Sequence, residues 1–392
     1  MKQFGLLGRI ILAIILGVLI GSFVSEEIIR LFATFNGLFG GFLSFIIPLI
    51  IIGFITPGIG TMGLGAGKTL GLSTALAYAS TIIAGLIAYF VARGLYPNLL
   101  GNQSMESVTD PSQGLSESFI VIEMPPPMEV MTALLLAFVL GIGIAAIKGD
   151  KLLHVMNDFR DIINLVIEKF IIPLLPFHIF GIFANMTHAG QVATILSVFA
   201  KVFVMIIILH ILYLILQYSV AGSMSKQNPF RMIKQMLPAY FTALGSQSSA
   251  ATIPVTLKQS KTLKIKESIA DFTVPLFATI HLSGSTITLV SCSLAVMYLQ
   301  GDAISFGAYF QFILMLGITM VAAPGVPGGA VMAAAGLLES ILGFDQTLLS
   351  LMIALYLAQD SFGTACNVTG DGALASITDS LSKSGKSSKL KA

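Results

Sequence analysis

Apolar segments long enough to cross a lipid bilayer recur along the chain, and they constrain its fold more than any other feature. They lie near residues 6–24, 34–60, 70–92, 128–147, 162–186 and 194–220. Only 10% of the 392 residues are charged, whereas soluble domains carry about 25%. A helix satisfies its own backbone hydrogen bonds in lipid, and about 20 residues of it span the hydrocarbon core. The sequence therefore predicts an all-α polytopic membrane protein surrounded by membrane lipid.

The distribution of Lys and Arg predicts which loops face the cytoplasm. The interval 94–127 contains no Lys or Arg, so the positive-inside bias places it outside the cell. Basic residues occur at both ends and between several spans, at Lys2, Arg9, Lys148, Lys151, Arg160, Lys226, Arg231, Lys234, Lys258, Lys261, Lys264, Lys266 and in the tail 383–392. We therefore expect both termini in the cytoplasm. The first span has no convincing cleavage site, so we expect no signal peptide.

Two segments interrupted by Gly, Pro and small residues break this pattern. The segment 236–257 lies between two basic clusters and contains the break Gly245–Pro254, so it should enter and leave on the inner side. A second break, Ala322–Ala330, lies between loops without Lys or Arg, so it should enter from outside. Two broken segments of opposite orientation indicate a transporter with inverted repeats and a site near the membrane midplane. Two kinked ordinary spans are the alternative.

The stretch from Asp360 to Asp371 brings charge into this apolar chain. Asp360, Thr364, Asn367 and Asp371 are spaced so that they share one face of a helix. A carboxylate at bilayer depth costs about 2.5 to 3.5 kcal/mol on insertion scales. The two carboxylates therefore require a bound cation, a substrate ammonium group or a water-filled cavity. A solvated helix end is the alternative.

Other residue patterns exclude several classes of function. We find no nucleophile paired with a base, no phosphate-binding loop after a strand and no zinc-ligand spacing, so we expect neither an enzyme nor a nucleic-acid partner. Cys292 and Cys366 lie in apolar runs, and no disulfide is expected. Four histidines without ligand spacing are expected to be packing residues: His154, His178, His188 and His210.

Four segments in the C-terminal half resemble the dicarboxylate/amino acid:cation symporter family, which contains glutamate and neutral amino acid transporters. They are Ser248–Pro254, Thr279–Ser285, Gly325–Gly328 and Asn367–Asp371, in the family's order. The N-terminal half is similar in hydropathy and span order. The resemblance implies eight transmembrane helices plus two re-entrant helical hairpins. It also implies a homotrimer in a bacterial inner membrane and an elevator-type motion.

The same resemblance implies how the chain is divided. Spans one and two (1–65) and spans four and five (128–190) would form a scaffold. Span three (66–93) would join residues 191–382 in a transport domain, which holds span six, both hairpins, and spans seven and eight. An outer polar loop (94–127) and a basic cytoplasmic tail (383–392) complete the chain.

The resemblance also assigns site residues. Asp360 would contact the ammonium group of the substrate, and Asn367 its carboxylate. The substrate-binding residues implied are Asp360, Asn367, Thr364, Ser248, Ser249, Val326, Gly328, Gly329 and Gly363. The sodium ligands implied are Asp371 and Asn367, with oxygens from Phe277, Thr279, His281 and Leu282. For Thr364, a hydrogen bond to its own helix carbonyl is an equal alternative.

Departures from the family's pattern favour a neutral substrate. Gly363 stands where transporters of acidic amino acids carry an Arg for the second carboxylate. Tyr356 replaces an acidic residue, and Gln247 replaces an Arg found in some members. Moreover, no Lys or Arg occurs between residues 267 and 382. Nothing in this half can form the bidentate clamp that a second carboxylate would need.

Two further departures concern the driving ion. Ser283 stands where the family has an Asp that helps to form a third sodium site, so we expect fewer coupled sodium ions. His281 replaces an Asn two residues earlier, and an imidazole can carry a proton near neutral pH. His281 is therefore a candidate for proton coupling. A neutral packing histidine is an equal alternative.

These observations predict a secondary active symporter. Its substrate would be a small neutral amino acid or a similar amine-bearing zwitterion. Sodium would drive the transport, and coupling to protons as well is an open alternative. A transporter of small carboxylates or dicarboxylates on the same fold is the second hypothesis, in which Asp360 would pair with a cation. An ion channel or a membrane receptor is the alternative from a different class.

Overall fold

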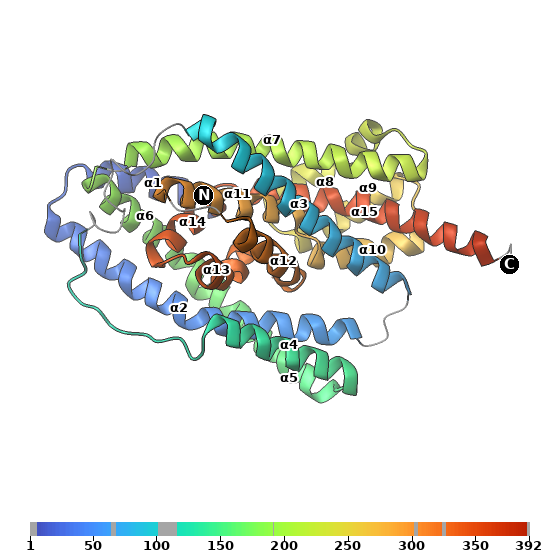
Figure 1. Ribbon diagram of the computed structural model, residues 1–392, viewed down its shortest axis with the longest axis horizontal. Helices are drawn as coiled ribbons and strands as arrows, with labels where there is room; N and C mark the ends of the chain where they lie inside the picture. The colour runs from blue at the N-terminus through green and yellow to red at the C-terminus, as the bar shows by residue number, and fades with distance from the viewer. Residues whose placement is uncertain are drawn as a thin grey trace.

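A computed structural model of the protein describes residues 6–63, 68–100, 116–190, 192–301, 305–323 and 327–389, and their regular structure is helical (Figure 1). The helices are α1 (Leu6–Gly21), α2 (Glu26–Gly63), α3 (Lys68–Leu100), α4 (Val130–Ile147), α5 (Asp150–Val166), α6 (Ile172–His188), α7 (Val192–Ser225), α8 (Pro229–Ser246), α9 (Ser249–Thr262), α10 (Glu267–Ile280), α11 (Ser283–Gln300), α12 (Phe306–Ala322), α13 (Gly329–Leu342), α14 (Gln346–Leu357) and α15 (Asp360–Lys389). A π-helical turn, Ile167–Ile171, joins α5 to α6. The predicted all-α class is confirmed.

Several of these helices are long and apolar enough to cross a membrane. Within the described ranges they are 26–60, 69–100, 150–188, 195–225 and 267–300. The pair α14 and α15, bent by 59°, makes a sixth if counted as one span. These helices are consistent with the predicted polytopic membrane class, whereas the count of eight transmembrane helices stays a prediction.

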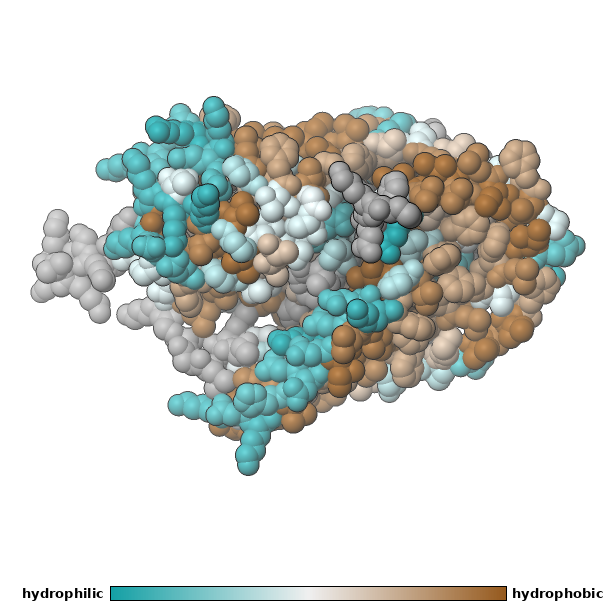
Figure 2. Space-filling view, turned by 180° about the vertical axis from the view of Figure 1, so that it is seen from behind, coloured by the Kyte–Doolittle hydropathy of each residue, from teal (hydrophilic) through white to brown (hydrophobic). Residues whose placement is uncertain are grey.

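The surface agrees with a lipid environment. Figure 2 shows apolar side chains over much of one face, with hydrophilic side chains gathered towards one end. Large apolar side chains are exposed on α4, for example Leu135 and Val139, which are 64% and 69% exposed. Such positions are unfavourable in water but match the hydrocarbon of a bilayer.

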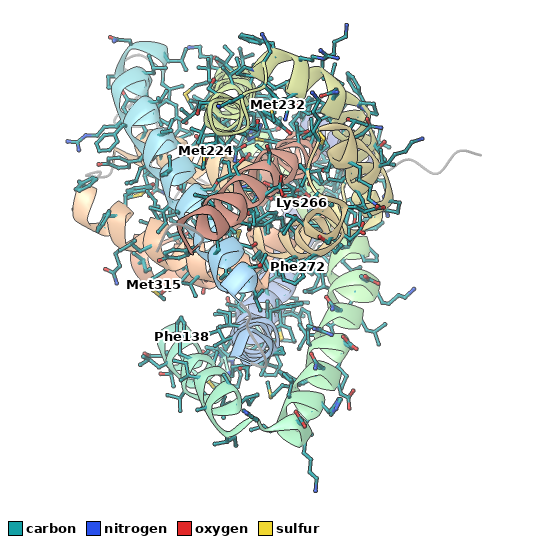
Figure 3. All side chains as sticks on the ribbon, turned by 90° about the vertical axis from the view of Figure 1, so that its right-hand side faces the viewer. Phe138, Met224, Met232, Lys266, Phe272 and Met315 are labelled. Carbon is teal, nitrogen blue, oxygen red and sulfur yellow. The ribbon has the colours of Figure 1, made fainter. Side chains whose placement is uncertain are left out.

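The helices pack in two groups. In the first, α2 lies along α4 and α6, and α1 lies along α6. In the second, α15 packs against α7, α8, α9 and α11, and α3 lies along α11. In Figure 3, Phe138 of α4 lies in the lower part of the view, whereas Met224 and Met232 of the second group lie in the upper part. In addition, α10 packs against α15, and α11 packs against α14 and α15. The breaks between α10 and α11 and between α14 and α15 therefore lie near the second group, where the site is predicted.

The first predicted hairpin is a pair of antiparallel helices, α8 and α9. Gln235, in the second turn of α8, donates to the carbonyl of Thr262 at the end of α9, at 3.4 Å. The break between the helices comprises only Gln247 and Ser248, which is shorter than the predicted Gly245–Pro254. Ser248 explains the difference, because its side chain accepts the N–H of Ala251 at 3.2 Å and so starts a new helix early.

The second hairpin and the end of α3 also refine the prediction. α12 ends at Ala322 and α13 begins at Gly329, so the helices stop at the predicted break.

α3 continues to Leu100, so the first residues of the polar interval predicted from 94 are helical. The reason is packing: Tyr96 is fully buried and donates its hydroxyl to the Ser291 carbonyl at 2.6 Å.

Candidate functional site

Asp360 is the first residue of α15 and lies at the bend after α14. Its Oδ2 accepts the backbone N–H of Gly328 at 2.7 Å. Gly328 has φ +74°, a left-handed conformation that glycine adopts without strain, and it precedes α13 as the N-terminal cap. Asp360 is only 5% exposed. This carboxylate therefore joins the tip of the α12–α13 hairpin to the start of α15.

Asn367 lies two turns further along α15 and contacts the first turn of α11. Its Oδ1 accepts the N–H groups of Gly284 at 2.7 Å and of Ser285 at 3.3 Å. Its Nδ2 donates to Ser285 Oγ at 3.0 Å. A substrate carboxylate needs a donor, and Nδ2 has a second hydrogen that is not used by Ser285.

Close contact between α11 and α15 makes this arrangement possible. A Cβ atom on Gly284 would clash with the Gly363 carbonyl and lie 2.6 Å from the Cβ of Cys366. Only a glycine therefore allows the N–H groups of α11 to reach Asn367. A Cβ on Gly363 would lie 3.4 Å from the Ser285 amide nitrogen, which is an ordinary contact.

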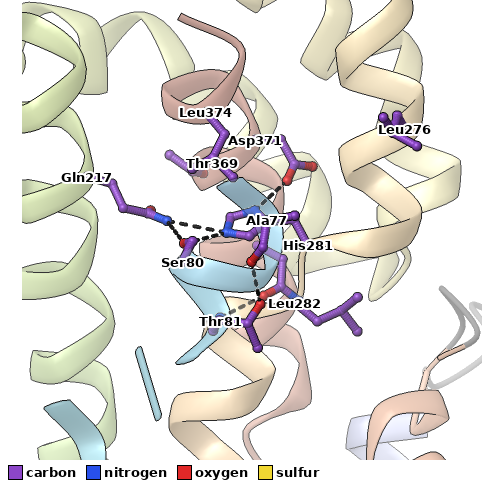
Figure 4. Close-up of polar contacts among 12 residues, drawn as sticks. Ala77, Ser80, Thr81, Gln217, Leu276, His281, Leu282, Thr369, Asp371 and Leu374 are labelled. Carbon is purple, nitrogen blue, oxygen red and sulfur yellow. Dashed lines mark hydrogen bonds and ion pairs between the residues drawn. The ribbon is translucent and has the colours of Figure 1, made fainter. Parts of the chain in front are cut away.

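His281 and Asp371 form a fully buried pair at the break between α10 and α11 (Figure 4). His281 Nδ1 lies 2.8 Å from Asp371 Oδ1. On the other side of the ring, Nε2 lies 2.9 Å from Ser80 Oγ of α3 and 3.4 Å from Gln217 Nε2 of α7. Gln217 also donates to Ser80 Oγ at 3.0 Å. The second carboxylate oxygen, Asp371 Oδ2, is buried without a hydrogen-bond partner among the described residues.

The sodium ligands implied by the family are largely engaged in other bonds. The Phe277 carbonyl accepts the His281 N–H at 2.9 Å, and the Leu282 carbonyl accepts from Thr286. Thr279 is exposed, and its hydroxyl donates to the Leu276 carbonyl at 2.7 Å. Asp371 Oδ2 is therefore the member of the set that is both charged and free to bind a cation.

Most of the remaining predicted site residues that the structure describes are buried. Thr364 and Ser249 are 5% and 6% exposed, and Gly329 is buried at the start of α13. Ser248 caps α9. Val326 lies outside the described residues.

Tyr356, which stands where the family usually has an acidic residue, lies next to Asp360. The ring is fully buried on α14. Its hydroxyl lies beside Asp360 and Ser285 but does not meet hydrogen-bond geometry with either of them. Among the described residues, the buried polar side chains include no Lys or Arg. A second substrate carboxylate would therefore find a hydroxyl here but no cation.

Sequence reasoning did not identify Ser80, Gln217, Tyr213 and Ser285 as parts of the site. Tyr213 belongs to the same cluster because its hydroxyl donates to the Ser80 carbonyl at 2.6 Å. Their polarity within apolar spans could have marked them, because polar residues in membrane segments face the protein interior and often have a function. Their side chains come from α3, α7 and α11, so their convergence on His281 or Asn367 could not be read from spacing.

Two of the other histidines have structural partners, as predicted for packing residues. His178 Nε2 lies 2.9 Å from Ser350 Oγ, and its Nδ1 lies 3.1 Å from Asn36. His210 Nε2 lies 3.0 Å from the Gly284 carbonyl.

Known proteins match the chain over nearly its whole length. A sequence model of the sodium:dicarboxylate symporter family matches residues 6–381. The serine/threonine transporter SstT of Acinetobacter baumannii (strain AYE) is 24% identical over 395 residues, which cover 97% of this chain and 98% of that protein. The protein of the same name from Streptococcus suis (strain 05ZYH33) is 26% identical over 341 residues, covering 84% and 94%. These matches and the apolar helices identify a multi-pass membrane transporter and not an enzyme: the chain belongs to the sodium:dicarboxylate symporter family.

Proposed function

We propose that this protein is a sodium-driven symporter of a small neutral amino acid. The observation that carries the proposal is a buried carboxylate, Asp360, in surroundings whose described buried residues include no Lys or Arg. An anion held at membrane depth favours a cationic group on the substrate. The ammonium group of an amino acid supplies that group.

The substrate would bind between α11, α14 and α15. Its ammonium group would contact Asp360, and its carboxylate would accept from Asn367 Nδ2. The names of the relatives make serine and threonine the first candidates. The buried Tyr356 hydroxyl, without a hydrogen bond of its own, supports a short side chain that bears a hydroxyl group.

The transport cycle would use the family's architecture. We expect a homotrimer in a bacterial inner membrane, with both termini cytoplasmic, eight transmembrane helices and two re-entrant hairpins, α8–α9 and α12–α13. The second group of helices would move as an elevator against α1, α2, α4, α5 and α6. The bond between Gly328 and Asp360 supports a role of the α12–α13 hairpin as the cover of the site, because substrate and hairpin meet at one carboxylate.

Sodium would bind as a co-transported ion, with Asp371 as its charged ligand. Proton coupling through His281 stays a separate hypothesis. It predicts that uptake by the His281→Asn variant loses its pH dependence and keeps its sodium requirement.

Counterflow of labelled L-serine into proteoliposomes tests the proposal. We expect saturable exchange that requires sodium and is not supported by potassium. Sodium-dependent uptake of glutamate with high affinity would favour the carboxylate hypothesis instead. Conductance without saturation or exchange would favour a channel.

A further inference from the structure

We propose that His281 is a positioning residue for the transported cation: it holds one oxygen of Asp371 so that the other oxygen is presented as the cation ligand. This inference rests on the proposed sodium-driven transport. It deepens that proposal by assigning the two oxygens of one carboxylate to different partners.

The first step is that the two oxygens of the Asp371 carboxylate have different surroundings. His281 Nδ1 donates to Asp371 Oδ1 at 2.8 Å, and both side chains are fully buried. Oδ2 is also buried but has no hydrogen-bond partner among the described residues. A buried carboxylate oxygen without a partner is unfavourable, since it has lost water and gained nothing. A ligand from outside the chain is therefore expected at Oδ2.

The second step is the chemistry of that ligand. Oδ2 is an acceptor with negative charge, and among the described residues no buried Lys or Arg can meet it. Hard cations such as sodium prefer carboxylate and carbonyl oxygens. The co-transported ion supplies the charge that the chain itself lacks at this oxygen.

The third step is the support of the ring from its far side. Ser80 Oγ lies 2.9 Å from His281 Nε2, and Gln217 bridges to Ser80 at 3.0 Å (Figure 4). Helices α3, α7, α10 and α15 thus meet at one imidazole. Residues that orient a ligand in this way commonly change metal affinity about 10- to 100-fold when they are replaced.

The fourth step is the space left for the ring. A Cβ on Gly370 would lie 3.0 Å from His281 Cε1 and 2.7 Å from Gln217 Oε1. Asp371 follows directly in the chain. The absence of a side chain at Gly370 therefore lets the ring and the amide approach α15 at the level of the carboxylate.

The test measures how much L-serine raises the melting temperature of the purified protein at increasing sodium concentrations. The midpoint is the sodium concentration at which half of the maximal rise is reached. His281→Ala removes the donor, and we expect this midpoint to rise about 10- to 100-fold. His281→Asn places an amide N–H near the position of Nδ1, so its midpoint should stay close to that of the wild type. Ser80→Ala should give a smaller rise than His281→Ala, and Asp371→Asn should raise the midpoint at least as much as His281→Ala.

His178→Asn is the matched control, because His178 is equally buried but lies between Asn36 and Ser350. Its midpoint should equal that of the wild type. An unchanged midpoint in His281→Ala or in Asp371→Asn overturns the inference. If His281→Ala does not fold, the comparison of Ser80→Ala with wild type decides, and an unchanged midpoint overturns the inference again. A wild-type protein without any sodium-dependent response to serine would instead contradict the proposed function.

Discussion

Gly328 donates its backbone N–H to the Asp360 carboxylate at 2.7 Å, and this bond links the tip of the α12–α13 hairpin to the first residue of α15. Both groups are buried, and the left-handed φ of Gly328 turns its N–H towards the carboxylate. A substrate ammonium group at Asp360 would therefore lie directly beneath the hairpin. Under the proposed function, Asp360 would couple substrate binding to the position of the hairpin.

The Asp360→Asn variant tests the role of the charge. An Asn oxygen can still accept the Gly328 N–H, so the hairpin contact survives while the anion is lost. Affinity for L-serine, measured by thermal shift, should fall by more than the roughly 0.5–1.5 kcal/mol of a neutral hydrogen bond.

Asp345→Asn is the control for this change. Asp345 caps α14 by accepting the N–H of Leu348 at 2.8 Å, and Asn is an equally good cap. Serine affinity in this variant should equal that of the wild type. Serine binding by Asp360→Asn at wild-type affinity would show that the ammonium group binds elsewhere.

Selectivity against dianions is the second expectation. A second carboxylate would enter beside Gly363 and Tyr356, where the described buried residues supply no cation, and a buried unpaired charge is strongly unfavourable. Unlabelled aspartate and glutamate should compete weakly with labelled serine, whereas alanine and threonine should compete well. Equal competition by glutamate and threonine would contradict this picture of the site.

The Asn367→Asp variant separates the two functions of this amide. A carboxylate can still accept the N–H groups of Gly284 and Ser285, so the packing of α11 should remain. The donor Nδ2 is lost, and a negative charge now faces the substrate carboxylate. Serine affinity at saturating sodium should collapse. The buried charge should also lower the melting temperature without substrate, so binding is measured well below that temperature. A variant that retains affinity would place the substrate carboxylate away from Asn367.

Gly284→Ala tests the contact between α11 and α15. The added methyl group would overlap the Gly363 carbonyl and crowd Cys366, and overpacking of this kind destabilises by about 1–3 kcal/mol. We expect a lower melting temperature and weaker serine binding, because Asn367 loses its partners. Gly143→Ala on α4 is the control, since a Cβ there meets nothing within 4 Å. The contact is less tight than described if both variants melt like the wild type.

Much of the fold follows from the sequence alone. Hydropathy predicts spans because a helix in lipid must satisfy its own backbone groups. The starts of α4 and α7 lie within two residues of the predicted ones. The grouping of Asp360, Thr364, Asn367 and Asp371 on one stripe follows from helical spacing, since these residues are close in the chain.

Other features depend on contacts between residues that are far apart in the sequence. Spacing does not predict that Ser80 and Gln217 meet His281, because 201 and 64 residues separate them along the chain. Nor does it predict that one oxygen of the Asp371 carboxylate binds His281 while the other has no partner among the described residues, or that Asn367 caps α11. Those relationships depend on how α3, α7, α11 and α15 pack, and packing is decided by the shapes that the assembled helices present to one another.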